Sequence, residues 1–471
     1  MLEVKRLVGI LKEQVTGSRF LVEVGSSRIL IDCGLYQERE FRARNWEVFP
    51  YEPSSIGSVV LTHAHIDHCG YLPRFVREGF SGKIHCTPPT FEIAEIALLD
   101  SAKLQVEDAE FKKKRHEMEG RKGVYPEVPL YTVEDAANVL PLFETIPYGK
   151  EIDISPGVRM TLHDAGHILG SEMVELKVRE NGKEKTCIFS GDIGRWDRPV
   201  LHNPEVFRRA DYVLVESTYG NRLHEEKEKE IPVEKLRRVI SETAEAGGNV
   251  VIPTFSIERA QELLFCISKL LRESKIPPLV VFVDSPMAID VTDVFKKYPG
   301  YLDEKSQKVI KEGKSPFDFP LLKTTRSTAE SKAINYIRGT SIIIAGSGMC
   351  TGGRIKHHLV NNIARKESTI LFVGYQAKGT LGRQILERPE GARILGRVLP
   401  VRARIEKING FSAHADRDEL LRWVSGFKEA PGKIFVVHGE KESSSHFASI
   451  LGSRFDSEVI VPEYLQEFPG L

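Results

Sequence analysis

The chain has 471 residues, 41% apolar and 28% charged, and is therefore long enough to build more than one hydrophobic core. Its 66 Lys and Arg balance 66 Asp and Glu, which argues against whole-protein steering towards a polyanion but leaves room for a local basic groove. Six scattered cysteines without a CxxC pair argue against a disulfide framework and against a thiolate zinc site. Neither a signal-peptide pattern nor an apolar run of about 18 residues occurs. We therefore expect a cytoplasmic protein that does not enter a membrane.

The first 60 residues alternate short apolar runs with turns, which predicts a β-rich start. From Phe91 the spacing of apolar residues predicts a long helix that trails into the charged stretch 112–115, a solvated helix face or loop. A second helix is predicted to start at Thr132, which forms a capping-box pattern with Asp135. Strands are predicted again at 186–192 and 212–218.

Strands and helices alternate further along the chain, which predicts a parallel sheet. The predicted strands are 249–255, 278–284, 341–348 and 369–375, with helices at 234–248 and 256–273. After residue 400 we expect a short tail with a helix at 417–427, a strand at 433–439 and a final αβ unit. The charged run 224–230 is expected to be an exposed loop.

Five apolar runs end at residues that can bind metal ions. These residues are Asp32, His63 with His65, Asp192, Glu216 and His438, and the segment TLHDAGH adds His167. In α/β sheets, function collects at the carboxyl ends of strands. We therefore expect one cleft that gathers imidazole and carboxylate groups.

The segment HAHIDH, residues 63–68, has an informative spacing. His63 and His65 are two residues apart, so in extended backbone both can point at one ion, while Asp67 and His68 can face a second. Imidazole with carboxylate suits Zn²⁺ and also tolerates Mn²⁺. Asp192 could bridge two ions, which at about 3.5–4 Å apart would generate a hydroxide nucleophile and clamp a phosphoryl centre. The alternative, a His-rich turn without function, is disfavoured because the motif directly follows a strand.

Six segments together resemble the β-CASP branch of the metallo-β-lactamase superfamily, in which RNA-processing nucleases are found. They are LTHAHIDHCG, DAGHILGS, FSGDIG, ESTYGNR, GFSAHAD and VVHGE, in the family's order. The resemblance implies an αββα sandwich with an inserted α/β β-CASP cap. The expected domains are 1–214 and 400–471 for the two parts of the metallo-β-lactamase domain, and 215–399 for the β-CASP domain.

The same resemblance implies roles for individual residues. One zinc would be held by His63, His65, His167 and Asp192, and the other by Asp67, His68, the bridging Asp192 and His438. Asp32 would orient a ligand histidine from behind. Asp67, Glu216 and His414 would be catalytic, with His414 protonating the leaving oxygen and Glu216 holding it in its acid form. In this branch, a histidine at position 438 resembles RNA-directed members.

The region expected to line the RNA path contains a glycine-rich turn after a strand, IIIAGSGMCTGGR. Exposed backbone N–H groups in such a turn can bind phosphate, although an ordinary turn is an equal alternative. The candidates for phosphate contact are Ser347, Gly348, Arg354, Lys378 and Arg383. The segment from Gly374 to Gly379 is a false P-loop, because Thr380 stands where a lysine is required.

The sequence therefore predicts a two-zinc ribonuclease that hydrolyses phosphodiester bonds of single-stranded RNA. The chain lacks the N-terminal RNA-binding modules and the long C-terminal extension of some relatives, so a stand-alone endonuclease is the simpler expectation, with 5′ exonuclease activity and a homodimer left open. The alternatives are a metal-dependent hydrolase of a small-molecule ester or thioester, and a non-catalytic RNA-binding subunit. The first would not need a cap of this size, and the second typically loses metal ligands.

Overall fold

The computed structural model describes residues 4–9, 16–38, 40–122, 126–180, 183–224, 231–337 and 339–469, so most of the charged run 224–230 lies outside the described residues. The chain divides into two compact units. Unit 1 comprises 1–196, 203–223 and 414–471, and unit 2 comprises 197–202 and 224–413. The domain boundaries expected at 214/215 and 399/400 stay predictions.

Unit 1 contains two seven-stranded sheets. The first has the order β22-β1-β2-β3-β4-β5-β6, with strands β1 (Val4–Gly9), β2 (Phe20–Val24), β3 (Ser27–Ile31), β4 (Ser58–Val60), β5 (Lys83–Cys86), β6 (Phe143–Thr145) and β22 (Gln466–Pro469). The second has the order β21-β20-β11-β10-β9-β8-β7, with β7 (Ile152–Ser155), β8 (Val158–Asp164), β9 (Glu172–Glu180), β10 (Lys183–Phe189), β11 (Tyr212–Glu216), β20 (Lys433–Val437) and β21 (Glu458–Ile460).

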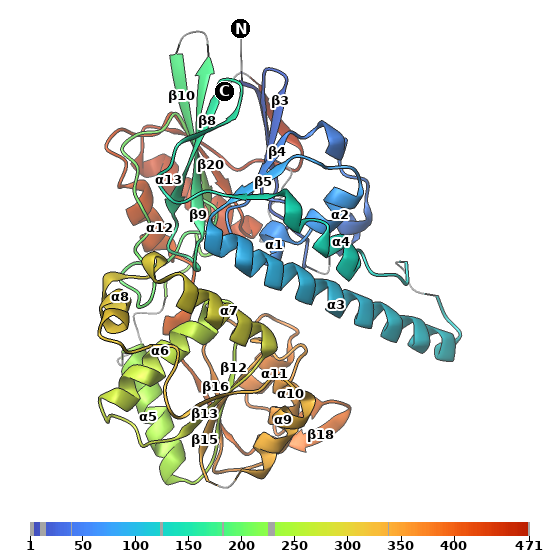
Figure 1. The fold of residues 1–471 in the computed structure, drawn as a ribbon, viewed down its shortest axis with the longest axis vertical. Helices are drawn as coiled ribbons and strands as arrows, with labels where there is room; N and C mark the ends of the chain where they lie inside the picture. Colours follow the sequence, from blue (N-terminus) through green and yellow to red (C-terminus); the bar gives the residue numbers. More distant parts are fainter. Residues whose placement is uncertain are drawn as a thin grey trace. The chain divides into compact units, whose positions relative to one another are not determined.

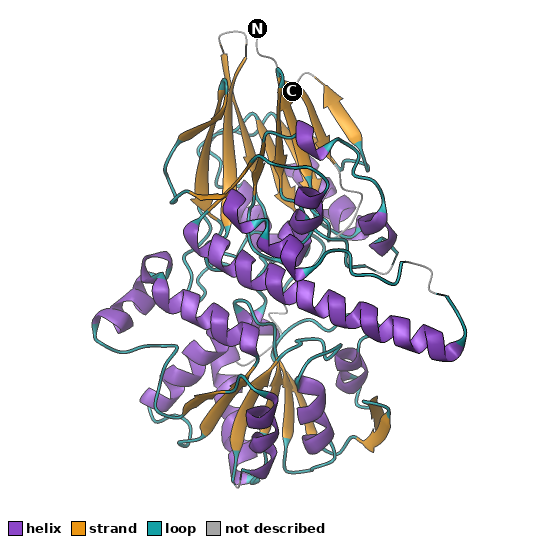
Figure 2. Cartoon of the chain, turned by 45° about the vertical axis from the view of Figure 1, so that its right-hand side comes forward, coloured by secondary structure: helices purple, strands orange, loops and turns teal. Residues whose placement is uncertain are grey.

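The two sheets pack face to face and are covered by helices on their outer faces (Figures 1 and 2). Their shared core joins Ile31 and Val60 of the first sheet to Leu176, Phe189 and Leu214 of the second. The helices of this unit are α1 (Ile66–Cys69), α2 (Leu72–Arg77), α3 (Pro88–Glu119), α4 (Val133–Ala137), α12 (Arg417–Val424) and α13 (Lys441–Arg454). This arrangement is the αββα sandwich expected from the sequence.

Helix α3 is longer than its apolar pattern indicates. It begins after Thr87, whose side chain accepts a hydrogen bond from the Thr90 N–H, and ends at Gly120, which has the left-handed φ of 63°. The charged stretch 112–115 lies inside it and is a helix face, supported by an ion pair between Lys112 and Asp108. The capping box predicted at Thr132 and Asp135 is confirmed at the start of α4.

Unit 2 is built around a six-stranded parallel sheet with the order β14-β13-β15-β12-β16-β19. Its strands are β12 (Val250–Pro253), β13 (Val280–Asp284), β14 (Leu322–Thr324), β15 (Ser341–Ala345), β16 (Thr369–Phe372) and β19 (Arg404–Lys407), and β17 (Gly391–Ile394) forms a hairpin with β18 (Arg397–Pro400). The helices are α5 (Pro232–Glu245), α6 (Arg259–Arg272), α7 (Pro286–Lys297), α8 (Glu304–Lys311), α9 (Thr328–Ala333), α10 (Ile355–Asn362) and α11 (Leu381–Leu386). The strand–helix alternation seen in the sequence thus becomes the predicted parallel sheet. Across the described part of the chain, no helix is both long and apolar enough to cross a membrane.

One histidine of unit 1 makes the stability of this fold depend on pH. His163 on β8 places Nε2 3.1 Å from Glu175 Oε2 and Nδ1 2.9 Å from Glu205 Oε1. Burial lowers the pKa of His163, but the two carboxylates outweigh this effect and raise the pKa to about 9. The charged His163 pairs therefore contribute their full stabilisation at pH values below about 6.5, the usual pKa of histidine in an unfolded chain. This contribution is lost as pH rises through about 9, the pKa in the folded protein.

We therefore expect His163→Gln to lower the free energy of unfolding at pH 6 by up to about 3 kcal/mol and to have much less effect at pH 10. Thermal unfolding of both proteins across this pH range measures the difference. His446→Gln, at an exposed position of the same unit, is the control. An equal loss at both pH values would contradict the charged pairing of His163.

Candidate active site

The strand ends that the sequence singled out meet in unit 1. Asp32 directly follows β3, Asp192 comes three residues after β10, Glu216 ends β11 and His438 follows β20. Besides Asp192 with Glu216 and His414, two groups of side chains there have ligand atoms within 4.8 Å of one another. The first group is His63, His65, His167 and Asp192, and the second is Asp67, His68 and His438.

The first group surrounds one oxygen of Asp192. Asp192 Oδ2 lies 3.4 Å from His63 Nε2 and 3.5 Å from His167 Nε2. His65 Nδ1 lies 3.0 Å from His63 Nε2 and 3.3 Å from His167 Nε2. Three imidazoles and one carboxylate oxygen therefore converge on one point.

The second group surrounds the other oxygen of the same carboxylate. Asp192 Oδ1 lies 3.3 Å from His438 Nε2 and 3.4 Å from His68 Nε2. Asp67 Oδ2 lies 4.0 Å from each of these two nitrogens. Asp192 thus presents one oxygen to each group, which is the geometry of a bridging carboxylate.

These residues fit divalent metal ions. Four ligand atoms held tetrahedrally at about 2.0–2.1 Å from zinc lie about 3.4 Å apart, which matches most of the observed separations. Asp192 Oδ1 and His68 Nε2 are buried and have no hydrogen-bond partner among the described residues. Unsatisfied buried polar atoms are costly, and a cation between them would satisfy both.

The electrostatics of the pocket leave the three histidines of the first group neutral. Burial, and next the neighbouring imidazoles, hold the pKa of His63 and His167 well below the usual range, so both rings are neutral. Burial also lowers the pKa of His65, to about 4. Burial opposes ionisation of Asp192, but His438, His68 and His63 hold its pKa well below the usual range. The three imidazoles of the first group and Asp192 are thus in the protonation states that metal binding requires. Burial lowers the pKa of His68, but Asp192 and Asp32 hold it well above the usual range, so a cation in the second group must displace a proton from this ring.

Asp32 lies behind this pocket and contacts one of its histidines. Its Oδ2 lies 2.8 Å from His68 Nδ1, and its Oδ1 accepts a hydrogen bond from the Thr62 N–H at 2.7 Å. Because Nδ1 of His68 faces Asp32, Nε2 faces Asp192. The carboxylate therefore sets both the ring orientation and the tautomer.

Ser18 contacts Nδ1 of His438 in the way that Asp32 contacts Nδ1 of His68, and the sequence did not predict this role. Its hydroxyl lies 2.8 Å from His438 Nδ1, and its N–H donates to the Asp67 carbonyl at 2.9 Å. Its own carbonyl accepts from the Gly34 N–H at 3.0 Å. Gly34 must be glycine there, because a Cβ would lie 1.6 Å from the Asp67 carbonyl oxygen. A lone serine 420 positions before its partner carries no sequence signal of this role.

We expect Ser18→Ala to lower the affinity for metal at the second group about 10- to 100-fold, as loss of an outer hydrogen bond to a metal-binding histidine does. Titration of metal-free protein with Zn²⁺, followed by calorimetry, measures this affinity directly. Ser18→Thr keeps the hydroxyl and is the matched variant. Equal affinities of wild type and Ser18→Ala would contradict this role.

His414 and Glu216 form a pair beside Asp192. Glu216 is fully buried, and its Oε1 accepts from the Ile193 N–H at 2.7 Å and lies 3.4 Å from His414 Nδ1. Backbone contacts between 193–194 and 414–415 hold the histidine against the Asp192 loop, including the hydrogen bond from the Ala415 N–H to the Ile193 carbonyl at 2.8 Å. Burial lowers the pKa of His414, but Glu216 and then Asp192 raise it above the usual value.

The phosphate-contact candidates all lie in unit 2 and differ in what they touch there. Ser347 contacts Thr351 Oγ1 at 3.2 Å within the glycine-rich turn, Gly348 packs on Phe255, and Arg383 pairs with Glu387 at 2.7 Å. Lys378 is exposed. Arg354 donates to Asp284 Oδ1 at 2.7 Å and to the carbonyls of 325 and 326, so much of its donor capacity serves the fold. Their roles towards RNA stay predictions.

Thr380, which breaks the P-loop pattern, caps helix α11. Asp284 ends the apolar strand β13, as the candidate metal ligands end or follow theirs, but the sequence did not single it out. It also lies 2.6 Å from His358 Nε2, in agreement with the structural role expected of that histidine.

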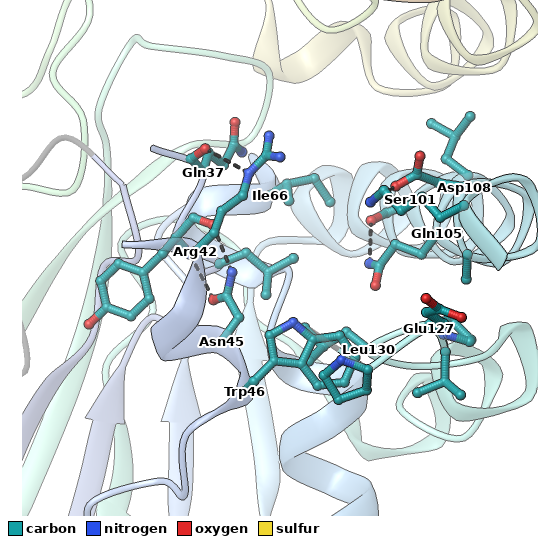
Figure 3. Close-up of a pocket in the computed structure, with 18 of the residues that line it drawn as sticks. Gln37, Arg42, Asn45, Trp46, Ile66, Ser101, Gln105, Asp108, Glu127 and Leu130 are labelled. Carbon is teal, nitrogen blue, oxygen red and sulfur yellow. Dashed lines mark hydrogen bonds and ion pairs between the residues drawn. The ribbon is translucent and has the colours of Figure 1, made fainter. Parts of the chain in front are cut away.

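A separate groove of about 1100 Å³ lies in unit 1, alongside α3 (Figure 3). Its lining includes Gln37, Arg42 and Trp46, the last two from a 3-10 helix (Arg42–Trp46). Ser101, Gln105 and Asp108 of α3 and Glu127 and Leu130 of a loop also line it. Ile66, which stands between His65 and Asp67, also lines it. The groove therefore begins next to the helix that carries two candidate metal ligands.

Three family models match successive parts of the chain. The Metallo-beta-lactamase superfamily matches residues 15–211, the Beta-Casp domain 260–385, and the Zn-dependent metallo-hydrolase RNA specificity domain 398–462. Ribonuclease TTHA0252 of Thermus thermophilus is 35% identical over 441 residues, which cover 94% of each chain. Transcription termination factor FttA of Methanocaldococcus jannaschii is 34% identical over 458 residues, which cover 95% of this chain and 69% of that protein.

The chain belongs to the β-CASP branch of the metallo-β-lactamase superfamily, as the motifs indicated. A solved structure of a protein of unknown function from Enterococcus faecalis V583 covers 99% of this chain with a TM-score of 0.56 and 13% identity. At this identity it supports the fold alone.

Proposed function

We propose that this protein is a metal-dependent ribonuclease that cleaves single-stranded RNA internally. One observation carries the proposal: Asp192 presents one oxygen to each of two histidine groups and lies beside the His414–Glu216 pair. Two adjacent ion sites with a neighbouring acid suit the displacement of one oxygen by another at phosphorus. Of the curated relatives, one is named a ribonuclease and another a transcription termination factor.

The candidate metal ligands form two sites, each for one divalent ion. His63, His65, His167 and Asp192 would hold one divalent ion, and Asp67, His68, Asp192 and His438 the other. Zinc suits this donor set, and manganese is tolerated. When bound, such ions lower the pKa of water and stabilise negative charge on phosphate oxygens.

The other steps of the proposed reaction depend on side chains of the protein itself. Asp192 and Asp67 add negative charge that keeps the pocket selective for cations. Glu216 accepts from the Ile193 N–H, which fixes its position opposite His414 Nδ1. His414 would hold its second proton at Nε2, the nitrogen on the side away from Glu216, and deliver it to the leaving 3′ oxygen. Asp32 and Ser18 keep His68 and His438 in the tautomers that present Nε2.

The test uses unstructured RNA labelled at its 5′ end, with protein loaded separately with Zn²⁺ or Mn²⁺. Internal fragments that disappear on chelation and return with metal are the expected result. Mononucleotide release would instead indicate a 5′ exonuclease. Intact RNA together with hydrolysis of a thioester would overturn the proposal in favour of a small-molecule hydrolase, and protein that retains no metal would favour an RNA-binding subunit.

A further inference from the structure

Helix α3 has a face that its own unit leaves uncovered. Ala102, Ala109 and His116 are buried against unit 1, and one flank of the uncovered face, with Leu104, Asp108 and Arg115, borders the adjoining groove (Figure 3). The C-terminal half of the helix extends away from the two sheets of its unit (Figures 1 and 2). The uncovered face follows from the 32-residue length of the helix.

Large apolar side chains form a line on this face. Leu104, Phe111 and Met118 are 57%, 64% and 81% exposed. Their spacing of seven residues is almost two helical turns, so all three point in nearly the same direction, away from the buried alanines. A regular apolar stripe on an otherwise charged helix is typical of a surface that packs against another helix.

The charges beside the stripe have opposite signs on the two sides of Phe111. Glu107, Asp108 and Glu110 precede it, and Lys112, Lys113, Lys114 and Arg115 follow it. A second helix of the same sequence, laid antiparallel with the two Phe111 rings at the centre, therefore meets acid with base. In a parallel arrangement the same residues would face like charges, which is unfavourable.

We propose that α3 is the interface of a homodimer in which it packs antiparallel against α3 of a second copy. The twofold axis passes between the two Phe111 side chains, and Leu104 packs against Met118 of the second copy. On one side of the stripe Asp108 faces Arg115 of the second copy, and on the other Glu107 faces Lys114. Each ion pair occurs twice by symmetry.

The ion pairs within one α3 helix do not prevent these side chains from pairing with a second copy. Asp108 contacts Lys112 of its own helix, and Arg115 Nε lies 3.8 Å from Glu119 Oε1. The side chains of Asp108 and Arg115 are 58% and 43% exposed, and exposed pairs of this kind contribute little to stability. Asp108 and Arg115 can therefore turn towards a partner helix, which also covers the apolar stripe.

Charge reversal tests the arrangement. Wild type should be a concentration-dependent dimer in sedimentation equilibrium at low salt and dissociate as salt is raised. The acidic variant Lys114→Glu/Arg115→Glu and the basic variant Glu107→Lys/Asp108→Lys should each dimerise about 30-fold more weakly. An equimolar mixture of the two should restore the dimer as a heterodimer, because acidic and basic helices then face each other.

Cross-linking tests the position of the axis. The six natural cysteines are buried, so an added surface thiol reports on its own position. Phe111→Cys should form a covalent dimer rapidly under mild oxidation, whereas Lys113→Cys, exposed on another side of the helix, should not. All substituted positions are exposed or partly exposed, so circular dichroism should show unchanged folding. A wild-type protein that stays monomeric at 100 times the concentration of the cleavage assay, or a dimer that the charge variants leave unchanged, would overturn the proposal.

Discussion

Replacing Asp192 by asparagine should reduce RNA cleavage by about 10³-fold or more, because the substitution removes the one charge that faces both histidine groups. Its Oδ1 and Oδ2 each lie 3.3–3.5 Å from two imidazole nitrogens. Asparagine keeps the shape but replaces one oxygen by an NH₂ group, which cannot bind a cation. The loss should therefore appear first in metal content and then in activity.

Metal analysis by mass spectrometry on the purified variant separates these effects. We expect fewer than two ions per chain in Asp192→Asn, together with loss of cleavage. Asp153→Asn, at an exposed position of β7 in the same unit, should retain both. An Asp192→Asn protein that binds as much metal as wild type and cleaves RNA at the wild-type rate would refute the bridging role.

Replacing His414 by alanine should lower kcat by about 10²–10⁴-fold without loss of metal, which distinguishes a proton donor from a metal ligand. The structure predicts a pH signature as well. Glu216 and Asp192 raise the pKa of His414 against the effect of burial, so the acid form persists above the usual pKa of histidine. Activity that needs this form is present at low pH and declines as pH rises through the raised pKa.

Glu216→Gln removes the charge that raises this pKa while it keeps the side-chain shape. The alkaline limb of the profile of kcat against pH should therefore shift to lower pH in this variant, and it should disappear in His414→Ala. Metal content measured in parallel should match wild type for both. An unshifted alkaline limb in Glu216→Gln would mean that another group sets it.

Local sequence was sufficient for much of the fold because the decisive signals are short-range. The alternation of apolar strands and amphipathic helices predicted the parallel sheet of unit 2, and Thr132 with Asp135 predicted the start of α4. The end of α3 was harder to predict, since the apolar period stops before the charged stretch. The helix continues through this stretch because i,i+4 ion pairs support it and Ala109 and His116 are buried against unit 1, and it ends at Gly120.

The sequence by itself was sufficient to predict which side chains are candidates for metal binding, because most of them follow a strand whose apolar pattern is visible, and HAHIDH places four of them within six residues. Only the tertiary structure decided how they share Asp192, since its two oxygens face side chains from three other segments, 63–68, 167 and 438. It also decided that Ser18 contacts His438 and that Arg354 pairs with Asp284, 70 positions away. Hydrogen bonds between distant residues depend on the packing of the sheets, and neither periodicity nor spacing records that packing.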